Sequence, residues 1–298
     1  MAERKIRVGL IIEDFNVQAW IYIMLEKIIQ SDFAEIVLIA NSNINSPGIK
    51  KKKPAFSLIN LYLKQERKLS KQKKSYTLRP VASIIENIPL INVSITKSND
   101  GSVEIKDDDV NKIEKYEADV LINLDLPYLK GKILNAAVCG VWAYDPMLRF
   151  DNNLFLQQIK EDDCSVSVTL KMFTEGFSSG RVLYKSFSAG TIVFNKNINW
   201  LYWKAASFIP RKLKELHEDG ATVFLDKAKN RIETGSNDTG YKSNFSFLSK
   251  HFSRLVKTIT GNALQFEQWV LLYCFPQTDQ QLPLDISKYR EITPPKDR

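Results

Sequence analysis

The chain has 298 residues, 44% of them hydrophobic, which is enough to build the core of one large domain or of two smaller ones. Its three cysteines have no metal-ligand spacing, and no apolar run approaches the length of a bilayer span. These features exclude a disulfide scaffold, a cysteine-based metal module and an integral membrane protein. We expect a cytoplasmic protein with reduced cysteines.

The net charge of +8 is concentrated in one segment. Residues 50–79 hold eleven lysines or arginines and a single acid, Glu66, so this segment carries +10 and the rest of the chain −2. Two interpretations remain open: a basic face that lies on an anionic membrane surface, and a solvated lysine-rich insertion. Because no aromatic residues are interleaved with the charges in a stacking pattern, we expect no nucleic-acid partner.

The first elements alternate between strand and helix. Residues 5–12 (KIRVGLII) are typical of a strand, residues 17–30 have helical apolar spacing after the candidate N-cap Asn16, and residues 36–40 are typical of a second strand. This order predicts a parallel sheet with right-handed crossovers.

The remaining elements continue this alternation. We predict strands at 90–94, 118–124, 141–144, 165–172 and 181–187, and helices at 107–117, 129–137 and 200–216, with a glycine-containing tight turn over 174–180. Residues 230–246 are rich in Gly, Asn, Ser and Thr and are typical of a linker, whereas residues 268–274 (QWVLLYC) are typical of a strand. The sequence therefore predicts an α/β domain over 1–225 with a Rossmann-like, mostly parallel sheet. Residues 226–298 would be a linker and C-terminal extension, or the start of a second domain.

Carboxylates follow two of the predicted strands. Asp125 follows the strand at 118–124 and precedes Pro127, and Asp145 follows the strand at 141–144 and precedes Pro146. Ligands of open α/β sheets bind at the carboxyl ends of the strands. The two aspartates are therefore either a pair that does acid–base or metal chemistry, or ordinary turn residues before proline.

Polar residues also follow the first predicted strand. Glu13 and Asp14 carry carboxylates suited to a sugar hydroxyl, and Asn16 opens a helix whose amides would suit a phosphate if the two acids did not stand beside it. The candidate substrate-binding residues are Asp14, Asn16 and Tyr144. The alternative is an ordinary capping loop.

From residue 5 to about residue 187 the chain resembles the formyltransferase family, whose N-terminal domain takes a formyl group from 10-formyltetrahydrofolate. The likeness is carried by NVQA at 16–19, by DVLINL at 119–124 with residues 129–134, by GVWAYDP at 140–146, and by SVSVTL at 165–170 with FSSG at 177–180. The resemblance implies a sheet of the formyltransferase type. It also implies that Leu124, Asp125, Leu126 and Tyr128 line a folate pocket.

The chain departs from this family at its three functional positions. The resemblance places Ala143 at the family's asparagine, Asp145 at its histidine and Ser178 at its aspartate. Formyl transfer to an amine needs a donor for the oxyanion and a base for the amine proton. Ala143 cannot donate, an ionised Asp145 would repel an oxyanion, and the chain's two histidines, His217 and His251, lie far from the motif.

Three functions therefore remain open. The resemblance implies a diverged domain that binds a small molecule at the strand ends without formyl transfer. The alternative is a folate-dependent formyl (one-carbon) transferase that acts on an amino sugar or a similar amine with Asp145 as base. A third possibility is a structural module without a ligand. We predict no metal.

Two further stretches indicate a context. YWKAASFIPRKL at 202–213 and the strand at 269–273 leading to PPKDR at 294–298 resemble formyltransferase-like domains fused to glucosamine inositolphosphorylceramide transferase or propeller-like domains. This resemblance implies a glycan-related role beside a propeller-like or glycosyltransferase-like partner domain.

Overall fold

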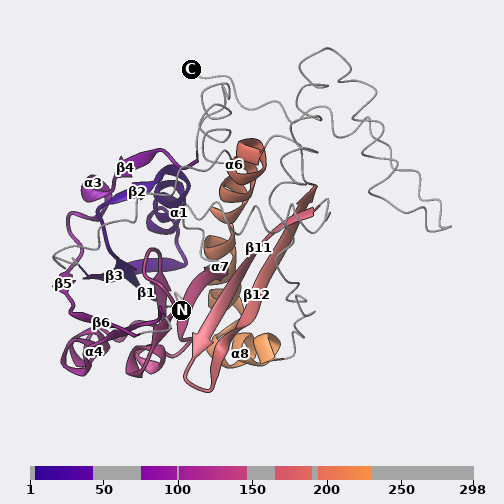
Figure 1. Cartoon of the computed structure of the whole chain (residues 1–298). Coiled ribbons are helices and arrows are strands. Elements are labelled where there is room, and N and C mark those ends of the chain that lie inside the picture. The colour runs from indigo at the N-terminus through magenta and orange to yellow at the C-terminus, as the bar shows by residue number, and fades with distance from the viewer. Residues whose placement is uncertain (1–3, 43–74, 99–100, 146–164, 190–193, 230–298) are drawn as a thin grey trace, which may run out of the picture. The chain divides into compact units, whose positions relative to one another are not determined.

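The computed structural model describes residues 4–42, 75–98, 101–145, 165–189 and 194–229 (Figure 1). The chain divides into two compact units, Met1–Leu248 and Ser249–Arg298, and every described residue belongs to the first. Residues 50–74 of the basic segment, the predicted linker at 230–246 and the predicted strand at 268–274 lie outside the described residues. The boundary predicted at residue 225 falls inside helix α8 (Ala221–Lys229).

The first unit is built on a seven-stranded sheet with the order β12-β11-β10-β8-β1-β3-β5. Five of the strands pair in parallel. The last two along the chain join the sheet through antiparallel pairs, β10 with β11 and β11 with β12. This arrangement confirms the predicted α/β class with a mostly parallel sheet. The parallel strands are β1 (Ile6–Ile12), β3 (Ala34–Asn41), β5 (Leu90–Asn92), β8 (Val120–Asn123) and β10 (Val141–Asp145), and the antiparallel strands are β11 (Ser165–Thr174) and β12 (Phe177–Ala189).

The direction of winding reverses between β1 and β8. The chain runs from β1 outward to β3 and β5, then returns to place β8 and β10 on the other side of β1. Leu124 N donates to Ile11 O at 3.1 Å, so the loop after β8 begins against the end of β1. A crevice at such a reversal is where open α/β sheets bind their ligands.

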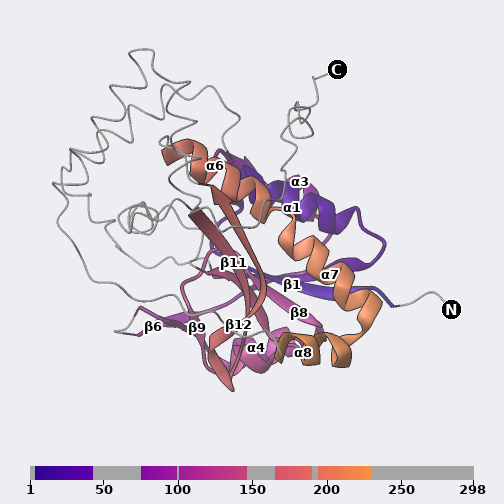
Figure 2. The same ribbon diagram turned by 90° about the vertical axis from the view of Figure 1, so that its right-hand side faces the viewer.

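Two different layers cover the sheet (Figure 2). Buried side chains of α1 (Ala19–Ile29), α6 (Phe194–Ala205), α7 (Phe208–Asp219) and α8 share one core with one face of the sheet. The other face packs against α4 (Asp107–Glu114), the 3-10 helix η1 (Lys132–Asn135) and a small sheet of β6 (Ile95–Lys97), β7 (Val103–Ile105) and β9 (Leu129–Lys130). We call these faces the helical face and the pocket face. β2 (Asn16–Gln18) pairs with β4 (Leu78–Pro80), which precedes the short helix α3 (Ala82–Ile85).

Three sequence predictions about helices are wrong. Residues 129–137 form β9 and η1, because Gly131 between them adopts a φ of +80° that no helix continues through. The helix predicted over 200–216 is two helices, broken at Ala206 and Ser207, because Pro210 has no N–H to give to the carbonyl four residues earlier. Asn16 is not an N-cap: it pairs with Pro80 in β2, and α1 begins only at Ala19.

Among the helices of the described ranges, none has the length and apolar character needed to cross a membrane.

Candidate functional site

The loop after β1 holds two of the predicted substrate-binding residues in a local turn. Asp14 Oδ1 accepts hydrogen bonds from Asn16 N at 2.9 Å and from Asn16 Nδ2 at 3.2 Å. Both side chains are exposed at the winding reversal, beside Glu13. The structure therefore brings Asp14 and Asn16 together, and one oxygen of the carboxylate is engaged in the turn.

The N-terminus of α1 is closed by the chain's own backbone. Ala19 N donates to Thr77 O at 2.8 Å, and Trp20 N donates to Ser75 O at 3.1 Å. Ser75 is itself buried, and its N–H donates to Asn199 Oδ1 of α6 at 2.7 Å. A helix binds phosphate through free amides of its first turn, and these two amides are occupied.

The loop after β8 is shaped by Asn123, which the sequence reasoning did not single out. Its Oδ1 accepts from Leu126 N at 3.0 Å, and its Nδ2 donates to Leu126 O at 3.0 Å. Leu126, held by these two hydrogen bonds, is completely buried. Leu124 packs toward the helical face. Asp125 is partly buried. Of the four residues predicted to bind the cofactor, Tyr128 is the one that lines the pocket described next.

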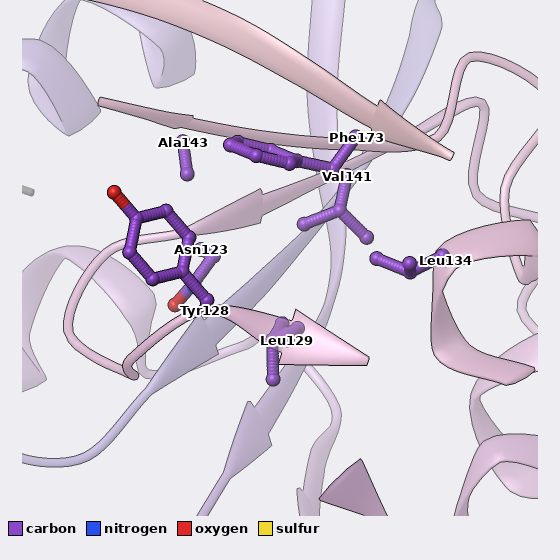
Figure 3. A pocket seen from close by; sticks show the side chains of 7 residues that line it. All are labelled: Asn123, Tyr128, Leu129, Leu134, Val141, Ala143 and Phe173. Atoms are coloured by element: carbon purple, nitrogen blue, oxygen red, sulfur yellow. The ribbon is translucent and has the colours of Figure 1, made fainter. Parts of the chain in front are cut away.

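An apolar pocket lies on the pocket face, between β8, β10 and β11 (Figure 3). Tyr128, half exposed, forms its outer wall, and its ring lies 6.1 Å from the ring of Phe173 at an angle of 65°. The described part of the pocket is small, with room for about one water molecule. The residues that line it are Asn123, Tyr128, Leu129, Leu134, Val141, Ala143 and Phe173.

Phe173 is held in place by two glycines in left-handed conformations. A Cβ on Gly140 (φ +64°) would lie 2.5 Å from Phe173 O, and a Cβ on Gly180 (φ +76°) would lie 2.8 Å from the Phe173 ring. No other residue fits at either position without moving the aromatic side chain or its backbone. Both glycines therefore pack directly against Phe173 at the back of the pocket.

Two predicted site residues of β10, Ala143 and Tyr144, point to opposite faces of the sheet. Ala143 is 5% exposed, and its methyl faces the pocket. Tyr144 faces the helical core, where its hydroxyl donates to Ala205 O at 2.5 Å and burial raises the pKa of the phenol well above its usual value. The prediction that Tyr144 binds substrate is thus corrected, because successive residues of a strand point to opposite faces.

For the other two predicted catalytic residues, the structure gives the position of the backbone. Asp145 ends β10, directly across from Thr169 of β11, and Ser178 is the second residue of β12. Asp125 and Asp145 follow or end neighbouring parallel strands, β8 and β10. Their roles stay predictions. In the described part of the chain, no group of three or more His, Cys, Asp or Glu side chains is arranged to hold a metal ion.

The pairing of β11 with β10 places a lysine on the pocket face, and the sequence reasoning missed this residue. Lys171 lies directly across from Ala143, and Phe173 lies directly across from Val141. A lysine between the apolar residues Leu170 and Met172 was a visible signal, but its neighbour across the sheet cannot be read from the sequence.

No family model and no curated protein matches this sequence. Solved structures do match. Glycinamide ribonucleotide transformylase 1 of Symbiobacterium toebii is 12% identical, covers 77% of this chain and 92% of its own, and has a TM-score of 0.39. A formyltetrahydrofolate deformylase of Pseudomonas putida KT2440 is 10% identical, covers 72% and 66%, and has a TM-score of 0.44.

The sugar 3N-formyl transferase WlaRD, solved in the presence of dTDP and 5-N-formyl-THF, is 9% identical, covers 82% of this chain and 71% of its own, and has a TM-score of 0.39. The fold class itself follows from the strand order and directions of this chain's own sheet.

Proposed function

We propose that this chain is a diverged formyltransferase-like domain that binds a small molecule at the carboxyl ends of β8 and β10 and does not transfer a formyl group. The observation that carries the proposal is the methyl group of Ala143 on the inner side of the pocket. This is the position where the resemblance calls for a hydrogen-bond donor to the oxyanion. A methyl group makes no such hydrogen bond.

The other polar side chains of the pocket do not replace that donor. The amide of Asn123 is engaged with both backbone groups of Leu126. The hydroxyl of Tyr128 stands on the half-exposed outer wall. Removing one oxyanion donor from a site of this kind costs roughly a hundredfold to a thousandfold in rate, and here the base is changed as well.

The described part of the pocket has room for about one water molecule. The pocket fits a methyl-sized group of a ligand whose remainder rests on the exposed ring of Tyr128. The apolar lining and the packing of Phe173 against Gly140 and Gly180 favour binding of such a group.

Two measurements test this function. With 10-formyltetrahydrofolate and an amine acceptor such as glucosamine, we expect no tetrahydrofolate release above the uncatalysed rate. In protein-observed NMR titrations with glucose, glucosamine, acetate and inorganic phosphate, we expect saturable shifts of β8 and β10 amides for at least one probe. These shifts should be lost in Ala143→Leu, which fills the pocket.

Val138→Leu is the matched control, because Val138 is 66% exposed and the added carbon meets solvent. Turnover that falls a hundredfold or more in Asp145→Asn would establish the enzymatic alternative instead, with Asp145 as base. Binding that is the same in Ala143→Leu and in the wild type would place the ligand elsewhere.

A further inference from the structure

A second basic stretch, separate from the basic segment at 50–79, covers β12 and α6. Residues 177–205 contain no aspartate or glutamate. Their basic residues are Arg181, Lys185, Lys196 and Lys204. The balance of −2 outside residues 50–79 therefore includes a stretch with a local charge of +4. Basic residues gathered in this way attract anionic partners.

One lysine joins α6 to the last strand of the sheet. Lys204 Nζ donates to Phe187 O at 3.0 Å, and Figure 1 shows α6 beside β11 and β12. Trp200 precedes Lys204 by four residues in α6, so the two side chains lie on the same side of the helix. Lys185 and Phe187 lie on one face of β12, with the Lys185 ammonium 5.0 Å from the centre of the Phe187 ring. These four residues form what we call the edge surface.

Both aromatic side chains of the edge surface are open to solvent. Phe187 is 57% exposed and Trp200 is 39% exposed. Exposed tryptophan and phenylalanine beside lysines are typical of proteins that bind the surface of a membrane. The rings enter the boundary between headgroups and acyl chains, and the long stem of a lysine keeps its ammonium among the headgroups.

The edge surface suits an anionic lipid layer better than it suits two other partners. A second copy of the chain in a two-fold contact would bring two positively charged surfaces together. A single-stranded nucleic acid stacks its bases on open aromatic faces, whereas the Lys185 ammonium lies over the Phe187 ring. A lipid layer attracts charge across about 8–10 Å of salt solution, so the hydrogen bond from Lys204 to Phe187 O stays in place.

We propose that the edge surface binds the headgroup layer of an anionic phospholipid membrane, with the ring of Phe187 as its main apolar contact. The surface is separate from the pocket between β8, β10 and β11, and its function does not depend on the small molecule bound there.

Sedimentation of the whole chain with vesicles tests the proposal. We expect binding to phosphatidylcholine vesicles that contain about one-third phosphatidylserine, and much weaker binding to pure phosphatidylcholine. Phe187→Ser should lower the partition coefficient about tenfold, because a ring that leaves water is lost. Lys185→Gln should lower it about fivefold, as for one positive charge near the surface. Phe187→Trp should bind at least as tightly as the wild type.

Two control variants leave the edge surface intact. Val138→Ser removes an apolar side chain that is 66% exposed, and Lys97→Gln removes the charge of an exposed lysine of β6. Each should keep the partition coefficient within about twofold of the wild type. Urea midpoints equal to that of the wild type show that the variants are folded.

Three outcomes would overturn the proposal. The wild type could fail to bind anionic vesicles. Vesicle binding could be the same in Phe187→Ser, Lys185→Gln and the wild type, which would move the lipid contact to another part of the chain. Binding to a fluorescent single-stranded oligonucleotide that falls in Phe187→Ser, without vesicle binding by the wild type, would assign the edge surface to nucleic acid.

Discussion

Asn123 decides the shape of the loop at the end of β8. Its side-chain amide is 4% exposed, accepts one hydrogen bond from Leu126 N and donates to Leu126 O and, at 3.4 Å, to Pro127 O. The amide thereby substitutes for backbone partners that the chain loses as it leaves the strand. Tyr128 and Leu129, which line the pocket, come directly after the residues that Asn123 holds through these hydrogen bonds.

Replacing Asn123 with alanine should therefore lower the free energy of unfolding by about 1–3 kcal/mol, since Leu126 would keep buried backbone groups without partners. Urea denaturation measures this loss. Asn111→Ala is the control: Asn111 is exposed on α4 and accepts a surface bond from Lys132, so its loss should cost under about 0.5 kcal/mol. Equal effects of the two substitutions would show that the hydrogen bonds of Asn123 to Leu126 contribute nothing to stability.

For single residues, the sequence predicted where polar side chains follow the strands, but not which residues they contact. Aspartates at the ends of β8 and β10 were foreseen at Asp125 and Asp145, because a polar residue before proline ends an apolar run in a recognisable way. The role of Asn123 and the position of Lys171 were not foreseen. Asn123 bonds to Leu126 through the shape of the loop itself, and Lys171 lies across from Ala143, which is distant in the sequence.

At the scale of elements, the joint between α6 and α7 is tied to the sheet by Tyr144. The phenol donates to Ala205 O, the last residue of α6, and its ring contacts Trp20 of α1 edge-on at 5.3 Å and Phe208 of α7 at 6.2 Å. One buried side chain of β10 thus meets three helices. The break at Ala206 and Ser207 makes this possible, because it turns the chain next to the carbonyl that accepts the hydroxyl.

Tyr144→Phe should cost about 1–2 kcal/mol at neutral pH through the lost hydrogen bond. Burial also raises the pKa of Tyr144 in the folded state, so the unfolded chain ionises first as pH rises past about 10. The stability contributed by this neutral phenol is complete below that pH and declines above it. Wild type should therefore lose more stability than Tyr144→Phe between pH 9 and pH 11.

Urea denaturation at several pH values measures both effects. Tyr22→Phe is the control, because Tyr22 is partly buried and meets Arg79 through its ring, at 5.5 Å, rather than through its hydroxyl. Tyr22→Phe should not remove the difference in pH dependence that Tyr144→Phe removes. A Tyr144→Phe profile parallel to that of the wild type would refute the argument.

At the scale of the whole molecule, the residues from Met1 to Leu248 form a compact unit of their own. Both cores described above lie in this unit, on the two faces of the seven-stranded sheet. A unit that contains its own core folds without the rest of the chain.

A chain ending at residue 248 should therefore unfold cooperatively, with a midpoint within about 4 °C of the full chain, a difference of about 1 kcal/mol. Differential scanning calorimetry of the two chains makes the comparison. Val120→Ala in both chains is a useful internal check, since Val120 is fully buried in β8 and its loss should lower both midpoints alike. Non-cooperative melting of the shorter chain would show that residues 249–298 are needed for the fold.

The sequence by itself determined the strands of the seven-stranded sheet, their order along the chain and the α/β class, because period-2 and period-3.6 apolar patterns are local and each of these strands carries its own. It also predicted a site at the strand ends, where apolar runs stop at polar residues. Only the tertiary structure decided the register of β10 against β11, which places Lys171 beside Ala143, and the faces of β10, which send Tyr144 to the core. Register and facing follow from hydrogen bonds and packing between segments distant in sequence, and no local pattern contains them.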